Sequence, residues 1–297
     1  MIAIPYHTRR LIASHPLTRD QKWRAYIRFI SWQLESRVRR SHSIHRWIGD
    51  SRFLVKRGDY GLTGNIYFGL HEFDDMGFLL HLLRAEDTFI DVGANQGSYS
   101  ILAGKVVGAT GKAFEPVPET FSRLRKNPNL NDIDQQVIAV NKAVGHAPGV
   151  IPFSSDCDTT NHALLPEERR ENAIEVIVTT LDEELEGMKP TLIKIDVEGY
   201  EHSVLRGAYQ TLENDCLKAL IVEIDRSNRY GTNSSDSLHI LNEHGFKPFQ
   251  YDPLTRKLTE LDLPANDAAN TIFVRDVEWV RHRTQTARPF SALGQSA

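Results

Sequence analysis

The chain has 297 residues, of which 40% are hydrophobic and 25% are charged, a composition ordinary for a soluble globular protein with one large domain and an extension. No run approaches the ~20 consecutive apolar residues that a membrane-spanning helix needs, and residues 1–16 lack the continuous apolar segment of a signal peptide. The two cysteines, Cys157 and Cys216, are too few for a disulfide framework or a zinc site. These features predict a cytoplasmic protein.

The formal net charge of −4 is unevenly distributed. Residues 1–57 hold 13 Lys and Arg against 3 Asp and Glu, a balance of +10, and the rest of the chain therefore has a balance of −14. This split predicts a basic extension on an acidic core. The extension either packs on the core or contacts an anionic partner.

The first segment contains one predicted amphipathic helix, over residues 18–40. Its apolar stripe consists of Trp23, Ile27, Ile30, Leu34 and Val38. We favour the interpretation that this helix packs over the substrate side of the main domain. The alternative is an interfacial helix, with aromatic residues in the lipid headgroups and arginines on anionic lipid, which would make the protein peripheral to a membrane. No nucleic-acid-binding motif accompanies the arginines. Glycine-containing breaks within residues 53–68 predict a hairpin.

Helix and strand patterns alternate beyond that point. Strands are predicted at 88–92, 112–115, 137–144, 150–153, 175–181, 192–197, 217–224, 246–251 and 269–274, and helices at 72–84, 98–107, 118–129, 200–212 and 235–244. This alternation predicts a doubly wound, mostly parallel α/β sheet. We therefore divide the chain into an extension (1–71), a main domain (72–280) and a loosely ordered tail (281–297).

The opening strand, turn and helix of the main domain span residues 87–100. Gly93 and Gly97 allow a sharp turn, and Asn95 tolerates a positive φ. Asn95 stands where a dinucleotide fingerprint has its middle glycine, and Asp91 would repel a pyrophosphate. A ligand with a cationic portion fits better, and S-adenosylmethionine carries a sulfonium and an ammonium group.

Two further motifs supply ionisable residues at strand ends. Glu115 ends the second strand, where its carboxylate can accept both hydroxyls of a ribose, and Pro116 directs the chain away. Later, alternation places Lys194, Asp196 and Glu198 on one side of a strand otherwise made of apolar residues. Charged groups in such a strand are costly to bury without partners, which favours a functional role.

Several motifs together resemble the FkbM-type methyltransferases. They are residues 89–100, 115–118 with Phe121 and Leu124, 180–182, and 193–201 with 204–208, and their order and spacing match as well. The resemblance implies a class I fold, with a seven-stranded sheet that is parallel except for its last strand. It also implies S-adenosylmethionine as the cofactor and O-methylation of a hydroxyl on a sugar, glycolipid or secondary metabolite.

By that resemblance, residues of all three motifs and of the segment after the third strand would bind the cofactor. The predicted cofactor residues are Asp91, Gly93, Ala94, Asn95, Gly97, Tyr99, Ser100, Glu115, Pro116, Ala143, Val144 and Asp196. The predicted acceptor is a small molecule, a glycan or a glycolipid, and its identity would depend on the variable segment before Glu72.

An aliphatic hydroxyl is a poor nucleophile, so a nearby base should help its methylation. Asp196 is the first candidate, with Glu198, Glu201 and His202 behind it, and Lys194 would orient Asp196. We expect no metal, although Asp196, Glu223 and Asp225 form a possible oxygen-ligand set for Mg²⁺. The alternatives are an NAD-dependent oxidoreductase, disfavoured by Asn95, and a non-catalytic binding protein that keeps the fold.

Overall fold

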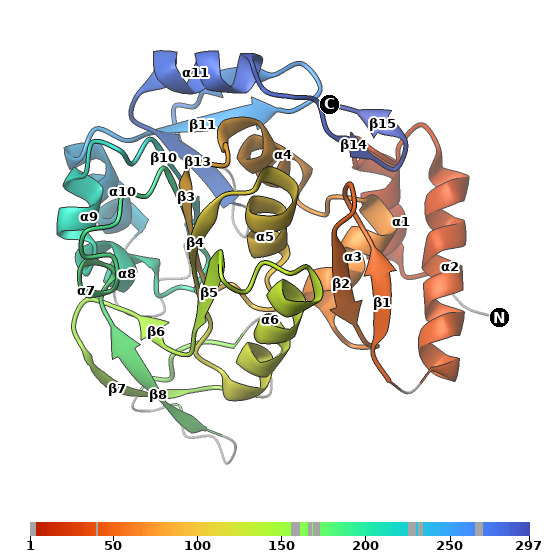
Figure 1. Cartoon of the computed structure of the whole chain (residues 1–297), viewed down its shortest axis with the longest axis horizontal. Coiled ribbons are helices and arrows are strands. Elements are labelled where there is room, and N and C mark those ends of the chain that lie inside the picture. Colours follow the sequence, from red (N-terminus) through yellow and green to blue (C-terminus); the bar gives the residue numbers. More distant parts are fainter. Residues whose placement is uncertain are drawn as a thin grey trace.

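The computed structural model describes residues 4–39, 41–155, 161–165, 168, 173–224, 230, 234–264 and 270–297. An eight-stranded sheet in the order β12-β11-β13-β10-β9-β3-β4-β5 forms its centre (Figure 1). The strands are β3 (Thr88–Val92), β4 (Thr110–Phe114), β5 (Val137–Val140), β9 (Leu192–Ile195), β10 (Ala219–Glu223), β11 (Lys247–Asp252), β12 (Lys257–Glu260) and β13 (Asn270–Val274).

Five neighbouring strands, from β5 to β10, are parallel, and β13 runs antiparallel to β10. This confirms the predicted class I sheet, in which the last strand along the chain is reversed. The prediction of seven strands was incomplete, because β12 pairs antiparallel with β11 as an eighth, at the sheet edge. Only one of the four residues of β12 is buried, so its sequence carries little apolar signal.

Alternating side chains divide the sheet core into two layers. On one face lie α4 (Phe73–Leu82), α5 (Ser98–Ile101) with its π-helical continuation (Leu102–Val107), and α6 (Pro118–Leu130) (Figure 1). On the other lie α8 (Glu201–Arg206), α9 (Tyr209–Glu213) and α10 (Ser234–Glu243). In β3, Phe89 packs into the first layer and Ile90 into the second. The sheet is therefore buried on both sides, as parallel sheets usually are.

A second, three-stranded sheet lies beside the carboxyl ends of the main strands. It contains β6 (Ala143–Val144), β7 (Gly149–Phe153) and β8 (Ile174–Thr179), in the order β6-β8-β7, and α7 (Leu181–Glu184) follows β8. The β7–β8 pair confirms the predicted added strands. The predicted strand 137–144 is instead two strands in different sheets, because the chain leaves the main sheet at Asn141, whose side-chain amide donates to the carbonyl oxygens of Glu115 and Pro116.

The N-terminal segment forms its own small core against the main domain. It contains α1 (Tyr6–Ser14), α2 (Lys22–Val38), the hairpin of β1 (Ser43–Arg46) and β2 (Arg52–Val55), and α3 (Tyr60–Phe68). The predicted hairpin at 53–68 was misplaced, because residues 60–68 are helical. Ile101 of α5 belongs to the same apolar cluster and joins the two parts.

The predicted packing of the α2 stripe was wrong. Trp23, Ile27, Leu34 and Val38 are more than half exposed, while the opposite face, with Phe29 and Trp32, is buried. Within the described residues, no helix has the length and apolar character needed to cross a membrane.

The prediction of a loosely ordered tail was also wrong. Helix α11 (Val277–Gln285) packs over α4, and β14 (Ser291–Ala292) pairs with β15 (Gln295–Ser296). The side chain of Arg283 donates to the carbonyl of Leu82 at 3.0 Å and forms an ion pair with Asp87. Phe290, Ala292 and Ala297 enter the main core. These apolar residues are too few and too widely spaced to give a periodic pattern in the sequence.

Candidate active site

A cavity of about 330 Å³ opens at the carboxyl ends of β3, β4 and β9. This is where ligands of open α/β sheets bind. All the predicted cofactor residues except Gly97 and Ser100 line it: Asp91, Gly93, Ala94, Asn95, Tyr99, Glu115, Pro116, Ala143, Val144 and Asp196. Lys194 and Glu198 of the predicted catalytic set line it too, whereas His202 does not.

The turn after β3 contains three residues of positive φ, of which Gly93 and Asn95 line the cavity. Asn95 has a φ of 50°, as the sequence predicts, and its side-chain oxygen is buried without a hydrogen-bond partner among the described residues. Gly93 has a φ of 80°, and a Cβ there would lie 1.8 Å from the carbonyl oxygen of Asp196. Glycine is therefore required for the close approach of the ends of β3 and β9.

Gly97 and Ser100 support the turn without lining the cavity. Gly97 is the N-cap of α5, in a left-handed conformation, and a Cβ on it would lie 2.7 Å from Leu124 of α6. The hydroxyl of Ser100 donates to Oδ2 of Asp91 at 2.7 Å. Both are positioning residues, and the sequence could not separate them from the cavity wall because they lie in the same motif.

The carboxyl group of Glu115 is fixed by two backbone donors. Its oxygens accept hydrogen bonds from the backbone N–H groups of Asn95 at 3.1 Å and Val117 at 2.9 Å. Burial raises the pKa of Glu115 to about 8, although these two bonds favour the charged form. Ribose hydroxyls would donate to the same carboxylate, so ligand binding should favour its ionised form.

A buried charge network connects β3 and β9. Lys194 lies opposite Asp91 in the neighbouring strand, and its Nζ is 2.7 Å from Oδ2 of Asp196. Burial alone would lower the pKa of Lys194, but Asp196, Glu72 and Asp91 outweigh burial and hold it above its ordinary value. Burial works to raise the pKa of Asp196, yet Lys194 holds it below the ordinary value. Asp196 is thus an ionised carboxylate oriented by Lys194.

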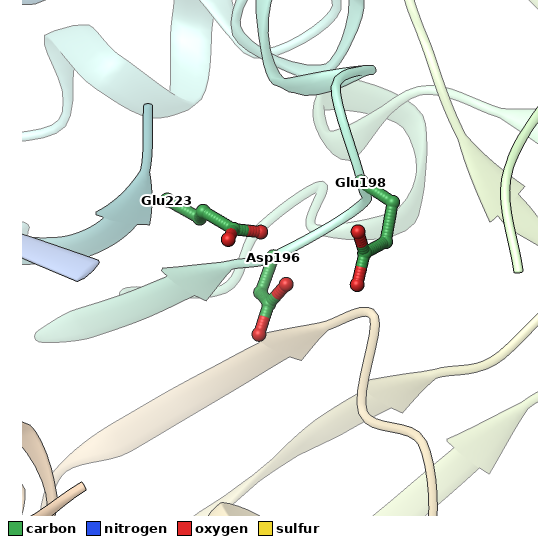
Figure 2. A group of neighbouring side chains, drawn as sticks. All are labelled: Asp196, Glu198 and Glu223. Atoms are coloured by element: carbon green, nitrogen blue, oxygen red, sulfur yellow. The ribbon is translucent and has the colours of Figure 1, made fainter. Parts of the chain in front are cut away.

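Three carboxyl groups gather beyond this network. Figure 2 shows Asp196 and Glu198 after β9 and Glu223 at the end of β10, and one oxygen of each lies within 4.8 Å of the others. Burial, followed by the charge of Asp196, raises the pKa of Glu223 to about 9, and its carboxyl group hydrogen bonds to Asp196. Since Glu223 keeps its proton at neutral pH, the pair shares one proton.

An acidic group of this kind does not by itself define a metal site, and we assign it none. It differs from the set considered from the sequence, because Glu198 stands in place of Asp225, which lies outside the described residues. Glu198 reaches the group by adopting a φ of 54°. Such a conformation is uncommon for a residue with a Cβ and often marks a functional turn.

The candidates Glu201 and His202 follow the turn after β9 and lie outside the cavity wall. Glu201 accepts hydrogen bonds from the backbone N–H groups of Val197 at 3.2 Å and Gly199 at 3.0 Å, and burial raises its pKa to about 8. His202 is one residue further along α8 and outside the cavity wall. Glu201 therefore positions the turn, and neither residue contacts the cavity.

The sequence missed a second cavity, of about 800 Å³, beside the first. The two share His71, Glu72, Asp196 and Glu223 in their walls. The second is further lined by residues of α4, β11, β13 and the N-terminal segment, among them Leu11, His15, Asp74, Asp75, Gln250, Tyr251 and Asn270. One signal was present in the sequence: three acidic residues, Glu72, Asp74 and Asp75, begin an otherwise apolar helix.

Comparisons with known proteins identify the family of the chain. The model of the methyltransferase FkbM domain matches residues 91–248. A relative described as the hexuronic acid methyltransferase AglP, from Haloferax volcanii, is 30% identical over 173 residues, which cover 58% of this chain and 68% of the relative. The chain belongs to the FkbM methyltransferase family. Its reaction is therefore S-adenosylmethionine-dependent methyl transfer, rather than the alternative of NAD-dependent oxidoreduction.

Two solved structures are more distantly similar. The FkbM methyltransferase of Methylobacillus flagellatus KT has 16% identity and a TM-score of 0.44, with 72% of this chain and 53% of that chain covered. The chain thus spans about half the length of that protein. TYW2 of M. jannaschii, solved in complex with AdoMet, has 13% identity and a TM-score of 0.38, with 79% and 87% covered.

The first cavity fits the cofactor of this FkbM chain. The unpartnered amide oxygen of Asn95 and the buried carboxylate of Asp91 can accept hydrogen bonds from an ammonium group. Glu115 offers its carboxylate to ribose hydroxyls, and Ala143 and Val144 give an apolar surface for a flat base. These assignments are our proposal for how S-adenosylmethionine is held.

Proposed function

We propose that this FkbM methyltransferase methylates a hydroxyl of a sugar unit held in the second cavity. The observation that carries the proposal is the wall shared by the two cavities, because it places Asp196 and Glu223 between the proposed cofactor and any molecule in the second cavity. A methyl donor and a hydroxyl bound on the two sides would meet at these carboxyl groups. Alignment of this kind accounts for much of the rate of a displacement reaction.

The composition of the second cavity supports a polyhydroxylated acceptor. Carboxyl groups and the amide of Gln250 can form several hydrogen bonds, while Phe249 and Ile272 supply apolar surface. Burial raises the pKa of Asp75 to about 8, so this residue and Glu223 are largely neutral at pH 7. The wall is thus less anionic than its composition suggests, and a uronic acid, the substrate named for the relative, remains compatible with it.

Asp196 is proposed as the base. Bound S-adenosylmethionine supplies a methyl group that its sulfonium makes transferable. The ion pair with Lys194 keeps Asp196 ionised and fixes its orientation, so one carboxylate oxygen can take the proton of the acceptor hydroxyl. The carboxyl group of Glu223 hydrogen bonds to Asp196 and, because it is protonated, adds no second negative charge beside the base.

An acceptor screen tests this proposal. The full chain is incubated with methyl-labelled S-adenosylmethionine and either uronic-acid or neutral-hexose oligosaccharides, and the labelled position is located by mass spectrometry. We expect an O-methyl ether on one class of sugar. Label on an amine, a carbon or a carboxylate ester, or no label on either class, would contradict the proposal.

A further inference from the structure

Helix α2 has two apolar faces, of which the structure buries one. Ala25, Phe29, Trp32 and Ser36 are buried against the rest of the N-terminal segment. On the opposite side, a second stripe follows helical spacing over four turns. Its members and their exposed fractions are Trp23 (59%), Ile27 (53%), Ile30 (37%), Leu34 (54%) and Val38 (82%). Scattered exposed apolar residues are normal, but a continuous stripe indicates an interaction surface.

The exposed stripe lies on a firmly attached element. The guanidinium of Arg28 donates through Nε and Nη2 to the carbonyl oxygen of Tyr67 in α3, at 3.0 and 2.8 Å. The Gln33 side chain donates to the Tyr67 hydroxyl at 3.3 Å, and the rings of Phe29 and Tyr67 pack 5.0 Å apart. The stripe is therefore exposed on the folded protein, and helix α2 lies at the outer edge of the molecule (Figure 1).

Basic residues border the stripe. Lys22, Arg24 and Arg37 are exposed on α2, and the Arg24 guanidinium lies 5.2 Å from the centre of the Trp23 ring. Glu35, the acidic residue of this helix, pairs with Arg39. Together with the balance of +10 over residues 1–57, these residues make the surroundings of the stripe cationic.

We propose that the α2 stripe docks the protein on the surface of an anionic lipid membrane, with the helix lying in the plane of the interface. An apolar face bordered by Lys and Arg, with a tryptophan among its members, is the pattern of interfacial helices. Anionic headgroups complement the bordering charges. A second copy of the chain fits less well, because pairing two α2 stripes would bring their arginines together.

This docking would set the active site near the membrane. Helix α3, on which α2 packs, contributes Gly61 to the wall of the first cavity, and α1 contributes Leu11 to the second. Both cavities therefore lie next to the elements that hold the stripe.

Vesicle co-sedimentation of the full chain tests the proposal. We compare phosphatidylcholine vesicles with and without phosphatidylglycerol, at about 0.1 M and about 0.5 M salt. We expect binding to the anionic vesicles, weakened by salt. The double variant Ile27→Glu/Leu34→Glu should bind at least about tenfold less, because it removes apolar area and adds like charge. The matched control is Ile138→Glu/Ile177→Glu, which changes two exposed isoleucines of the main domain and should bind as the wild type does.

Other outcomes would overturn the proposal. They are an absence of binding, equal binding to both kinds of vesicle, and equal losses in the two double variants. A dimer in sedimentation velocity that Ile27→Glu/Leu34→Glu dissociates, with no vesicle binding, would assign the stripe to a second copy. Circular dichroism of each variant confirms folding, so that a loss of binding reports on the stripe.

Discussion

At the scale of single residues, the site depends on one buried lysine among carboxylates. Lys194 is 3% exposed and touches Asp196, while Asp91 lies opposite it in the next strand. A buried charge without partners would be strongly unfavourable. Lys194 stabilises the ionised forms of Asp91 and Asp196, and the two carboxylates stabilise the charged lysine, whereas the charge of Asp196 works against ionisation of Asp91. The arrangement keeps Asp196 charged at the cavity wall, as a proton acceptor requires.

Replacing Asp196 by Asn should lower kcat by roughly a hundredfold or more, the usual contribution of a general base. Affinity for S-adenosylhomocysteine serves as the internal control and should change much less, because the proposed ribose contact is on Glu115. Thermal unfolding shows whether the loss of a partner for Lys194 harms the fold. A variant that retains wild-type kcat would rule out Asp196 as the base.

Much of this site was predictable from residue order, because each motif ends a parallel strand. Asp91, Glu115 and Asp196 therefore had to meet at one edge of the sheet. Neighbours within a motif were harder to assign. Ser100 and His202 lie one helical turn or less from cavity residues, and only the helix orientation shows that they face elsewhere. Glu72 was missed because it comes from a helix start that no strand pattern connects to the crevice.

At the scale of elements, the close approach of the β3 and β9 turns forms the cavity wall. Gly93 makes this close approach possible, because glycine has no Cβ and leaves room for the carbonyl oxygen of Asp196. The predicted packing of α2 failed because the prediction considered only one face of the helix. A stripe of apolar residues indicates one face of a helix, but α2 has two such faces, and the sequence does not say which one is buried.

Gly93→Ala should lower the free energy of unfolding by about 3 kcal/mol or more, because strain at positive φ adds to a backbone clash. Gly187→Ala is the matched control: its φ is 74°, but a Cβ there would meet no atom within 4 Å. The control should lose only about 1 kcal/mol. Urea unfolding measures both, and equal losses would show that the close approach to Asp196 does not matter.

At the scale of the whole molecule, the acidic main domain buries carboxyl groups that stay protonated. Burial raises the pKa of Asp75, Glu115 and Glu201 to about 8, and that of Glu223 to about 9. Folded carboxyl groups with raised pKa values bind protons that the unfolded chain has already released. Their contribution to stability is complete below about pH 4 and is lost as pH rises through 8 to 9.

The free energy of unfolding should therefore fall between about pH 6 and about pH 9. Glu223→Gln should flatten this decline, because an amide cannot ionise, and the exposed Glu213→Gln should leave it unchanged. Guanidinium unfolding at the two pH values measures the difference. A wild-type stability that rises over this interval would contradict the assigned protonation states.

Calorimetric titration with S-adenosylhomocysteine tests whether the first cavity binds the cofactor. The wild type should bind one equivalent, and Glu115→Gln should bind roughly ten- to a hundredfold more weakly, because charge-assisted hydrogen bonds to the ribose are lost. Glu201→Gln is the control, since Glu201 is also buried and accepts two backbone N–H groups but does not line the cavity. Absence of binding by the wild type, or unchanged affinity in Glu115→Gln, would contradict the account.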